Sequence, residues 1–203
     1  MKIAEKSIAE DELYSLALAV IDSINDTIAA SFRNDFPEAE LLQKRRLKPL
    51  LLPITECIPH ISNTSESTIA LVDSIKKSYQ KQQWRQPYSI EDFGSDFFHK
   101  SAWFPIADVN GPLVYPDGLM EIMLMGPGLT YPKHKHEPEE LYIVLSGKVW
   151  WETEKDGETP CWKRAGEAIY HAPNQVHAIT SGDEPVLVLN LWRGGGFQIP
   201  KII

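Results

Sequence analysis

Three histidines and one glutamate in the C-terminal half of the chain have the types and spacing of metal ligands. His134 and His136 are two residues apart, so that in a strand both imidazoles point to the same face. Glu140 follows closely, and His177 belongs to a later segment. Three nitrogens and one oxygen suit zinc, iron(II), manganese, nickel or cobalt, and leave room for water or substrate. The sequence therefore predicts one divalent transition metal without deciding which.

Glycines at fixed distances place these residues in a longer pattern. Every specified position of G-x5-HxH-x3-E-x6-G, the first motif of the cupin family, is matched by Gly128, His134, His136, Glu140 and Gly147. A lone HxH pair often arises by chance, but the full spacing is much more selective. The segment therefore resembles a cupin metal site, and the resemblance implies a β-barrel around it.

The second cupin motif, G-x5-PxG-x2-H-x3-N, is matched less closely. Gly166 and His177 keep the correct separation, whereas the proline is shifted by one place to Pro173. Asn174 stands where the second glycine is expected, and Ser181 replaces the final asparagine. Asparagine tolerates a left-handed turn better than most residues, so we expect only the shape of this loop to differ.

A more specific resemblance lies within the cupins. The chain is similar to the cupin-type dimethylsulfoniopropionate (DMSP) lyases of marine bacteria, and among them to the Q type, at Tyr131, His134, His136, Glu140, Tyr142, His177 and Trp192. The close similarity covers residues 128–192. It implies a carbon–sulfur lyase that cleaves a small zwitterionic carboxylate, DMSP or a close analogue, by β-elimination to dimethyl sulfide and acrylate.

The resemblance assigns Tyr142 as the general base. In this elimination a metal ion on the substrate carboxylate stabilises the enolate-like charge that develops as the α proton leaves. A tyrosine titrates at about 10 in water, and a neighbouring metal ion favours its anionic form. Tyr142 lies two residues after Glu140, so a regular strand points both into one cavity. Periodicity alone favours an ordinary inward-facing barrel aromatic.

Two further aromatics have roles under the same resemblance. Tyr131 precedes the HxH strand and is expected to bind the substrate carboxylate or to share the role of base; the alternative is a rim aromatic beside Pro132. Trp192 is expected to hold the sulfonium by a cation–π contact, and the alternative is a core tryptophan. Of the adjacent Trp150 and Trp151, at most one can line the site, and neither is assigned.

Other polar residues near the motifs receive no ligand role. His60, His99 and His171 have no partner at ligand spacing, although His171 lies in a strand that can approach the cavity. Glu137 and Glu139 flank a proline in an expected loop, and we expect them to be solvated.

Two other functions fit the same ligands. The first is an iron-dependent cupin dioxygenase that acts on a small thiol or organic acid, because the ligand set does not encode the reaction. The second is a non-enzymatic cupin that binds a metal and a small ligand. The aromatic residues around the expected metal site favour the lyase.

The first third of the chain has helical periodicity. An apolar stripe recurs at spacings of three and four residues from Leu13 to Ile28. A second helical pattern begins at Pro37, includes the basic run Lys44-Arg45-Arg46 and is expected to end near Pro53. A third, from Ile69 to Tyr79, follows the capping residues Asn63-Thr64-Ser65.

The period changes after Trp84, where short runs rich in valine, isoleucine, tyrosine and tryptophan alternate with turn residues. Strands are expected at 119–125, 141–145, 149–152, 168–171, 176–180 and 186–192. The predicted fold is mainly β: a cupin barrel of the double-stranded β-helix or jelly-roll type, preceded by about three helices. We expect a helical region over 1–84 that packs on a barrel over 85–203, or that forms the seam of a homodimer.

Composition limits the partners. The chain has 20 basic and 28 acidic side chains, a net charge of −8, and no basic block that could follow a phosphate backbone. We therefore expect no nucleic acid and no membrane partner, because no apolar run approaches the length of a membrane span. The N-terminal sequence has no signal peptide pattern, and the two cysteines lack a CxxC arrangement, which favours the cytoplasm.

Overall fold

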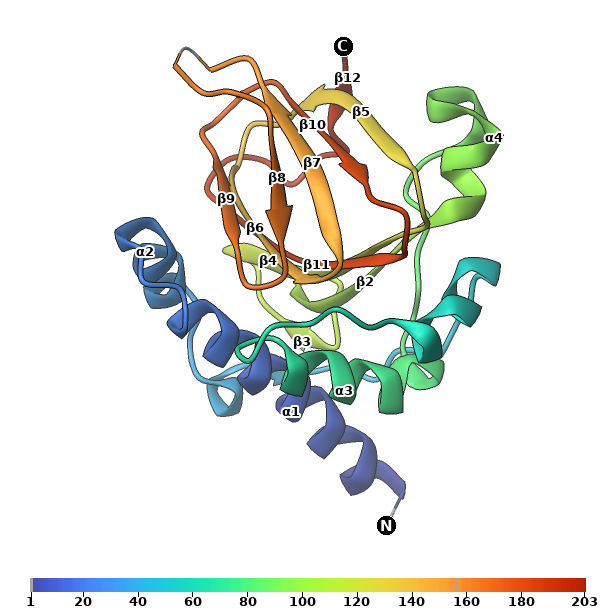
Figure 1. Ribbon diagram of the computed structural model, residues 1–203. Coiled ribbons are helices and arrows are strands. Elements are labelled where there is room, and N and C mark those ends of the chain that lie inside the picture. The colour runs from blue at the N-terminus through green and yellow to red at the C-terminus, as the bar shows by residue number, and fades with distance from the viewer. Residues whose placement is uncertain (1, 156) are drawn as a thin grey trace.

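Strands dominate the chain after residue 100 in the computed structural model, which describes residues 2–155 and 157–203 (Figure 1). In chain order the strands are β1 (Gln43–Lys44), β2 (Ser101–Asp108), β3 (Leu113–Val114), β4 (Gly118–Met125), β5 (Thr130–Lys135), β6 (Glu139–Ser146), β7 (Lys148–Thr153), β8 (Cys161–Arg164), β9 (Ala168–His171), β10 (His177–Ser181), β11 (Val186–Arg193) and β12 (Lys201–Ile202). The α-helices are α1 (Lys2–Asp22), α2 (Thr27–Asp35), α3 (Ile69–Ser78) and α4 (Ile90–Lys100), and the 3-10 helices are η1 (Ala39–Leu41), η2 (Pro53–His60) and η3 (Tyr79–Lys81).

The strands form two sheets that face each other. The larger has the order β1-β3-β2-β4-β11-β6-β9, and the smaller has the order β12-β5-β10-β7-β8. Apart from the short parallel pair of β2 and β3, all these ladders are antiparallel. The expected mainly-β fold with helices in front of a jelly-roll barrel is therefore confirmed.

The larger sheet is buried on both faces, which explains its nearly continuous apolar strands. In β11, Val186 and Val188 belong to a core cluster inside the barrel, whereas Leu187 and Leu189 belong to a second cluster under the helices. Successive side chains of a strand point to opposite faces, so the two valines of the VLVL run pack in one core and the two leucines pack in the other. Only Asn190 interrupts this run with a buried polar side chain.

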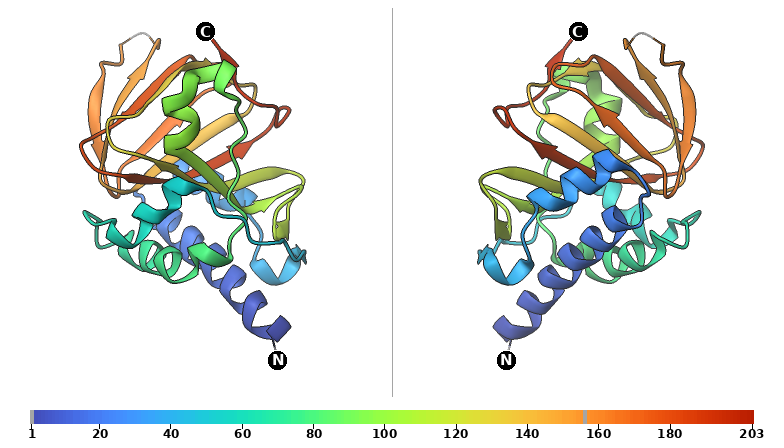
Figure 2. Two further views of the ribbon diagram at one scale, coloured as in Figure 1. Left: turned by 90° about the vertical axis from the view of Figure 1, so that its right-hand side faces the viewer. Right: turned by 90° about the vertical axis from the view of Figure 1, so that its left-hand side faces the viewer.

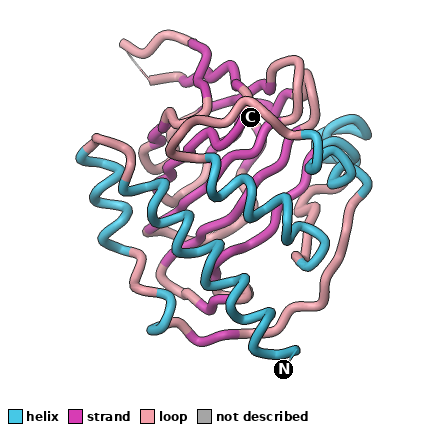
Figure 3. Tube along the Cα trace, turned by 60° about the horizontal axis from the view of Figure 1, so that its bottom comes forward, coloured by secondary structure: helices cyan, strands magenta, loops and turns pink. Residues whose placement is uncertain are grey.

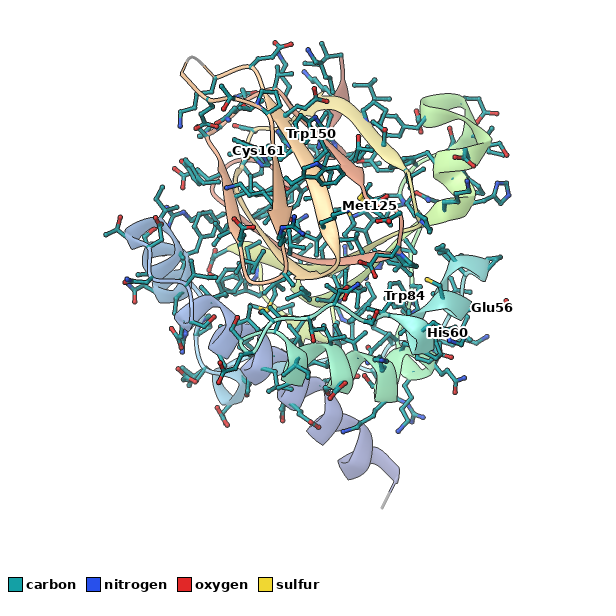
Figure 4. The ribbon with its side chains drawn as sticks, viewed as in Figure 1. Glu56, His60, Trp84, Met125, Trp150 and Cys161 are labelled. Carbon is teal, nitrogen blue, oxygen red and sulfur yellow. The ribbon has the colours of Figure 1, made fainter. Side chains whose placement is uncertain are left out.

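The N-terminal helices cover the outer face of the larger sheet (Figures 2 and 3). Trp84, which points between the helical layer and the barrel in Figure 4, packs edge-on against Phe104 of β2 at 4.7 Å between ring centroids. Both side chains are fully buried. Among the described helices, none has both the length and the apolar character needed to cross a bilayer. α4 lies apart from this layer, beside the barrel and β5.

Two of the three expected helical segments differ from the structure. The stripe from Leu13 to Ile28 is divided between α1 and α2, because the Asp26 side chain accepts the backbone N–H groups of Ile28 and Ala29 and so begins a new helix. The prediction of a second helix between Pro37 and Pro53 is wrong. Instead the chain forms η1, the extended β1, which pairs with β3, and η2, which begins at Pro53.

The third helix and all six expected strands are confirmed to within a few residues, as α3, β4, β6, β7, β9, β10 and β11. The sequence patterns did not indicate α4, β2 or β8. β1 comes from the first 84 residues and yet belongs to the larger sheet, and one apolar cluster joins α1, α3 and that sheet. The division of the chain at residue 84 stays a prediction.

The contact between helices and barrel gives a stability prediction. Replacing Phe104 by alanine leaves a cavity against Trp84, so we expect the free energy of unfolding to fall by about 3–5 kcal/mol. Urea denaturation followed by circular dichroism measures it. Leu41, which is 77% exposed, is the control: Leu41→Ala should change the same free energy by about 0.5 kcal/mol or less. Equal losses in the two variants would contradict this packing.

Candidate metal centre

The four predicted ligands come together where the two sheets face each other. In the smaller sheet, His134 of β5 lies directly opposite His177 of β10. His136 follows one residue beyond the end of β5 and is also buried. In the larger sheet, β6 contributes Glu140, which is 0% exposed. The ligands are therefore brought together both by the local HxH spacing and by the pairing of two strands that are distant in sequence.

Three of these side chains already form a compact ligand cluster. Ligand atoms of His136, Glu140 and His177 all lie within 4.8 Å of one another, so this cluster can hold a metal ion. His134 is not part of that set, but its ring centroid is 4.1 Å from the ring centroid of His177. The structure therefore places His134 beside the cluster as a candidate fourth ligand.

Backbone carbonyls orient all three imidazoles in the same way. The Nδ1 atoms of His134, His136 and His177 lie 2.7, 2.9 and 2.8 Å from the carbonyl oxygens of Pro132, Pro138 and Gln175. Each Nδ1–H therefore donates to a carbonyl, and each Nε2 is left for another partner. This arrangement is typical of histidines that bind metals through Nε2.

The surroundings of the three Nε2 atoms favour a bound metal ion. Nε2 of His134 and Nε2 of His177 are buried without a hydrogen-bond partner among the described residues. Nε2 of His136 and of His177 also lie 3.1 and 3.2 Å from Oε2 of Glu140. Lone pairs of nitrogen and carboxylate oxygen repel at such distances unless a proton or a metal ion stands between them. The donor set of three nitrogens and a carboxylate thus suits a divalent transition metal.

Glu140 has two further hydrogen bonds. The indole N–H of Trp192 donates to Oε1 at 2.5 Å, and Nδ1–H of His171 donates to Oε2 at 2.7 Å. Burial raises the pKa of Glu140, but attraction to His136 and the hydrogen bond from His171 hold that pKa well below its usual range. Burial likewise lowers the pKa of His136, and attraction to Glu140 outweighs it and raises that pKa. Glu140 is therefore an ionised, fixed carboxylate.

His171, which received no ligand role from the sequence, belongs to the support of the site. The indole N–H of Trp151 donates to its Nε2 at 2.8 Å, so the single proton of the ring is on Nδ1, which faces Glu140. Burial, and next the proximity of His177, lowers the pKa of His171 to about 4. A neutral imidazole thus links Trp151 to the carboxylate.

Both predicted tyrosines are buried beside the histidines. The ring centroid of Tyr142 is 5.4 Å from that of His171 and 6.2 Å from that of His177. Tyr131 stacks on His134 at 3.8 Å, and its hydroxyl shares a hydrogen bond with the hydroxyl of Tyr88. Burial raises the pKa of each phenol well above 10, and for Tyr142 the charge of Glu140 adds to the rise.

Trp192 faces the ligands and contacts two of them, in addition to its expected role in holding the sulfonium. Its N–H is used by Glu140, and its ring lies 4.4 Å from the ring of His136, tilted by 30°. Trp192 therefore supports two ligands at once. Its expected contact with the sulfonium stays a prediction.

Of the two adjacent tryptophans and the two glutamates near the motifs, only Trp151 points into the barrel toward the site. Trp151 points inward to His171, whereas Trp150 packs against Trp162 outside the barrel at 5.6 Å. Glu139 accepts a hydrogen bond from Arg193 at 2.7 Å, and Glu137 accepts the N–H of Gly196 at 3.0 Å. Neither glutamate reaches the cluster of His136, Glu140 and His177.

The departures from the second cupin motif are explained by local hydrogen bonds. Asn174 has a φ of 59°, the left-handed conformation that the missing glycine would supply, and its N–H donates to the carbonyl of His136 at 2.8 Å. Ser181 accepts the N–H of Leu129 and donates to the carbonyl of Gly126, and so connects β10 to the loop before β5. Both residues thus help to hold the histidine strands.

Removing the Trp192 donor tests how Glu140 is held. Trp192→Phe keeps a ring against His136 but deletes the N–H, so we expect zinc affinity to fall by about tenfold to a hundredfold. Competition titration of zinc with a chromophoric chelator measures it. Trp162→Phe, on a side chain that is 42% exposed outside the barrel, is the control and should leave the affinity unchanged. An unaltered affinity in Trp192→Phe would show that this hydrogen bond does not support a ligand.

Comparison with known proteins identifies the family of this chain. A family described as dimethylsulfoniopropionate lyase matches residues 23–188. The DMSP lyase DddQ of Ruegeria pomeroyi is 28% identical over 156 residues, which cover 75% of this chain and 76% of the relative. A crystal structure reported for the DMSP lyases RdDddP and RnDddQII is 26% identical and superimposes with a TM-score of 0.86 over 97% of this chain and 98% of that one. DddQ of R. pomeroyi DSS-3, at 24% identity, shares the fold with a TM-score of 0.81, over 96% and 95% of the two chains. The chain belongs to the dimethylsulfoniopropionate lyase family.

Proposed function

We propose that this protein is a metal-dependent DMSP lyase that cleaves DMSP to dimethyl sulfide and acrylate. Membership of the family supports the substrate and the reaction class. The observation on which the mechanism depends is that Tyr142 is buried in the barrel beside His171 and His177, two residues from Glu140 on the same strand face. A cytoplasmic location and a homodimer stay predictions from the sequence.

The proposed ligands are His134, His136, Glu140 and His177. A divalent ion held by them would draw electron density from the substrate carboxylate and so make the adjacent C–H bond more acidic. The protein holds the proposed ligands in fixed positions in a buried environment. The carbonyl bonds to the three imidazoles and the two donors on Glu140 keep the ligand atoms in place.

Tyr142 then acts as the general base, because a bound divalent ion would lower the pKa of its phenol, which burial and the charge of Glu140 raise. Its phenolate oxygen takes the α proton, the C–H electron pair becomes the new C=C bond of acrylate, and the C–S pair leaves with neutral dimethyl sulfide. Elimination consumes no water, and the interior beside Tyr142 is apolar, with Val144, Ile169 and Val188 in the same cluster. A site of this kind protects the base from competing protonation.

Tyr131 is proposed to position the substrate carboxylate. Its stacking on His134 and its hydrogen bond to Tyr88 fix the ring, so that its hydroxyl stays at the side of the ligand cluster. Tyr88 is a support that sequence patterns did not indicate, and it comes from the segment before α4.

Product analysis tests the reaction. Purified protein loaded separately with zinc, iron(II), manganese, nickel and cobalt should release dimethyl sulfide and acrylate from DMSP in equal amounts, measured in the headspace and in solution. Turnover should persist without oxygen, because elimination needs no oxidant. Oxygen consumption coupled to turnover would instead indicate a cupin dioxygenase, and absence of both products with every metal would overturn the assignment.

Tyr142→Phe separates catalysis from metal binding. The variant lacks the basic oxygen and keeps the ring, so we expect kcat for DMSP to fall by about a hundredfold or more while the metal content stays the same. Initial rates and elemental analysis measure the two. Tyr79→Phe, on the helical side of the molecule, is the control and should keep full activity. A fully active Tyr142→Phe would exclude it as the base.

His134→Ala tests the fourth ligand. Since its Nε2 is buried without a hydrogen-bond partner among the described residues and faces His177, we expect bound metal after dialysis to fall by at least about half. Elemental analysis gives the stoichiometry, and His99→Ala at an exposed position should retain all of it. Full metal retention in His134→Ala would limit the ligand set to His136, Glu140 and His177.

A further inference from the structure

A second row of polar side chains runs across the inner face of the larger sheet, next to the row that holds Glu140. Glu121 of β4 pairs in register with Asn190 of β11, and Asn190 pairs with Tyr142 of β6. The neighbouring row is Leu119, Trp192 and Glu140, in the same strand order. A carboxylate thus lies two strands, or about 10 Å, from the proposed base on the same face.

Glu121 and Asn190 bring three side-chain oxygen atoms together at one end of this row. The Asn190 side chain, only 2% exposed, donates one amide N–H to Oε1 of Glu121 at 3.2 Å. The other end of the same amide, Oδ1, is buried without a hydrogen-bond partner among the described residues. Among the residues that the structure describes, no basic side chain forms an ion pair with Glu121 within 4.0 Å, and the nearby Arg85 pairs with Asp108 at 3.1 Å. The buried amide oxygen of Asn190 and the partly exposed carboxylate of Glu121 both direct negative charge to this place, which favours a positively charged partner.

A cavity of about 210 Å³ opens onto Glu121. Its walls combine apolar side chains, among them Trp103, Leu119 and Phe197, with the ion pair of Arg85 and Asp108. Trp103 also packs at 6.1 Å from the ring of Tyr131, which connects this wall to the catalytic tyrosines. Burial, and next the charge of Asp108, raises the pKa of Glu121 to about 8, so at neutral pH this carboxyl ionises fully only when a cation lies beside it.

We propose that Glu121, with Oδ1 of Asn190 and the ring of Trp103, binds the cationic end of the substrate. This inference rests on the proposed lyase function and names the residues that select its substrate by charge. A sulfonium has no N–H or O–H group to donate. It is recognised by carboxylate charge, by carbonyl dipoles and by aromatic faces, and this end of the row provides all three.

The reaction itself predicts which kinetic parameter depends on Glu121. The positive charge on sulfur disappears as dimethyl sulfide leaves, so the attraction of Glu121 is strongest for the bound substrate and weaker in the transition state. Losing it should raise KM and leave kcat unchanged or slightly higher. Glu121 is thus a determinant of specificity, and the weak attraction to neutral dimethyl sulfide favours release of the product.

Glu121→Gln tests the proposal, because the amide keeps the shape and removes the charge. With metal-loaded protein, we expect KM for DMSP to rise by about tenfold, with kcat within about twofold of the parent protein. The second probe is 4-methylpentanoate, which replaces the sulfonium by a neutral CH group and keeps the carboxylate. Its inhibition constant should be equal in the parent and in Glu121→Gln, which also shows that the variant is folded.

Glu56→Gln is the matched control, since Glu56 is exposed on η2, away from the barrel interior (Figure 4). It should leave KM and the inhibition constant unchanged. An unchanged KM in Glu121→Gln, or a loss confined to kcat, would overturn the cation subsite while the lyase activity of the parent protein stands. If the parent protein itself releases no dimethyl sulfide, the proposed function fails first.

Discussion

A fully buried carboxylate, Glu140, is the constraint on which the rest of the site depends. An isolated charge in a protein interior costs several kcal/mol or more, so it persists only with partners. Two N–H donors, from Trp192 and His171, satisfy part of its charge. The remainder is directed at the Nε2 atoms of His136 and His177, and a proton or a metal ion must stand between these atoms and the carboxylate. Charge balance therefore connects metal binding to the stability of the barrel.

The N-terminal helices α1, α2 and α3 contribute to this site from the far side of the larger sheet. They cover the outer face of the larger sheet, so β6 and β11 are buried on both sides and their inner side chains are held by packing from behind. A carboxylate and an indole on such strands cannot move apart without disrupting two cores. Phe104 and Trp84 are part of this support. The rigidity that a metal centre needs is thus supplied from a layer far from the ligands.

Local patterns predicted the parts of the fold that depend on neighbours in sequence. Strands with apolar runs and the helix at Ile69–Ser78 were found because their periodicity is local. The helix expected after Pro37 does not form. There, pairing of Gln43 and Lys44 with β3 and the prolines that follow outweigh a weak helical pattern. The division of the first helix at Asp26 depended on a capping bond that periodicity alone does not reveal.

The sequence by itself determined the ligand types, because the spacing of His134, His136 and Glu140 fixes which side chains share a strand face. Only the tertiary structure decided what surrounds them. His171 supports Glu140, and Glu121 joins the row of Tyr142, through the register of strands that are far apart in sequence. Register follows from packing of whole strands and not from any short pattern. For this reason the metal ligands were predicted from a motif, whereas their supports and the candidate cation subsite were not.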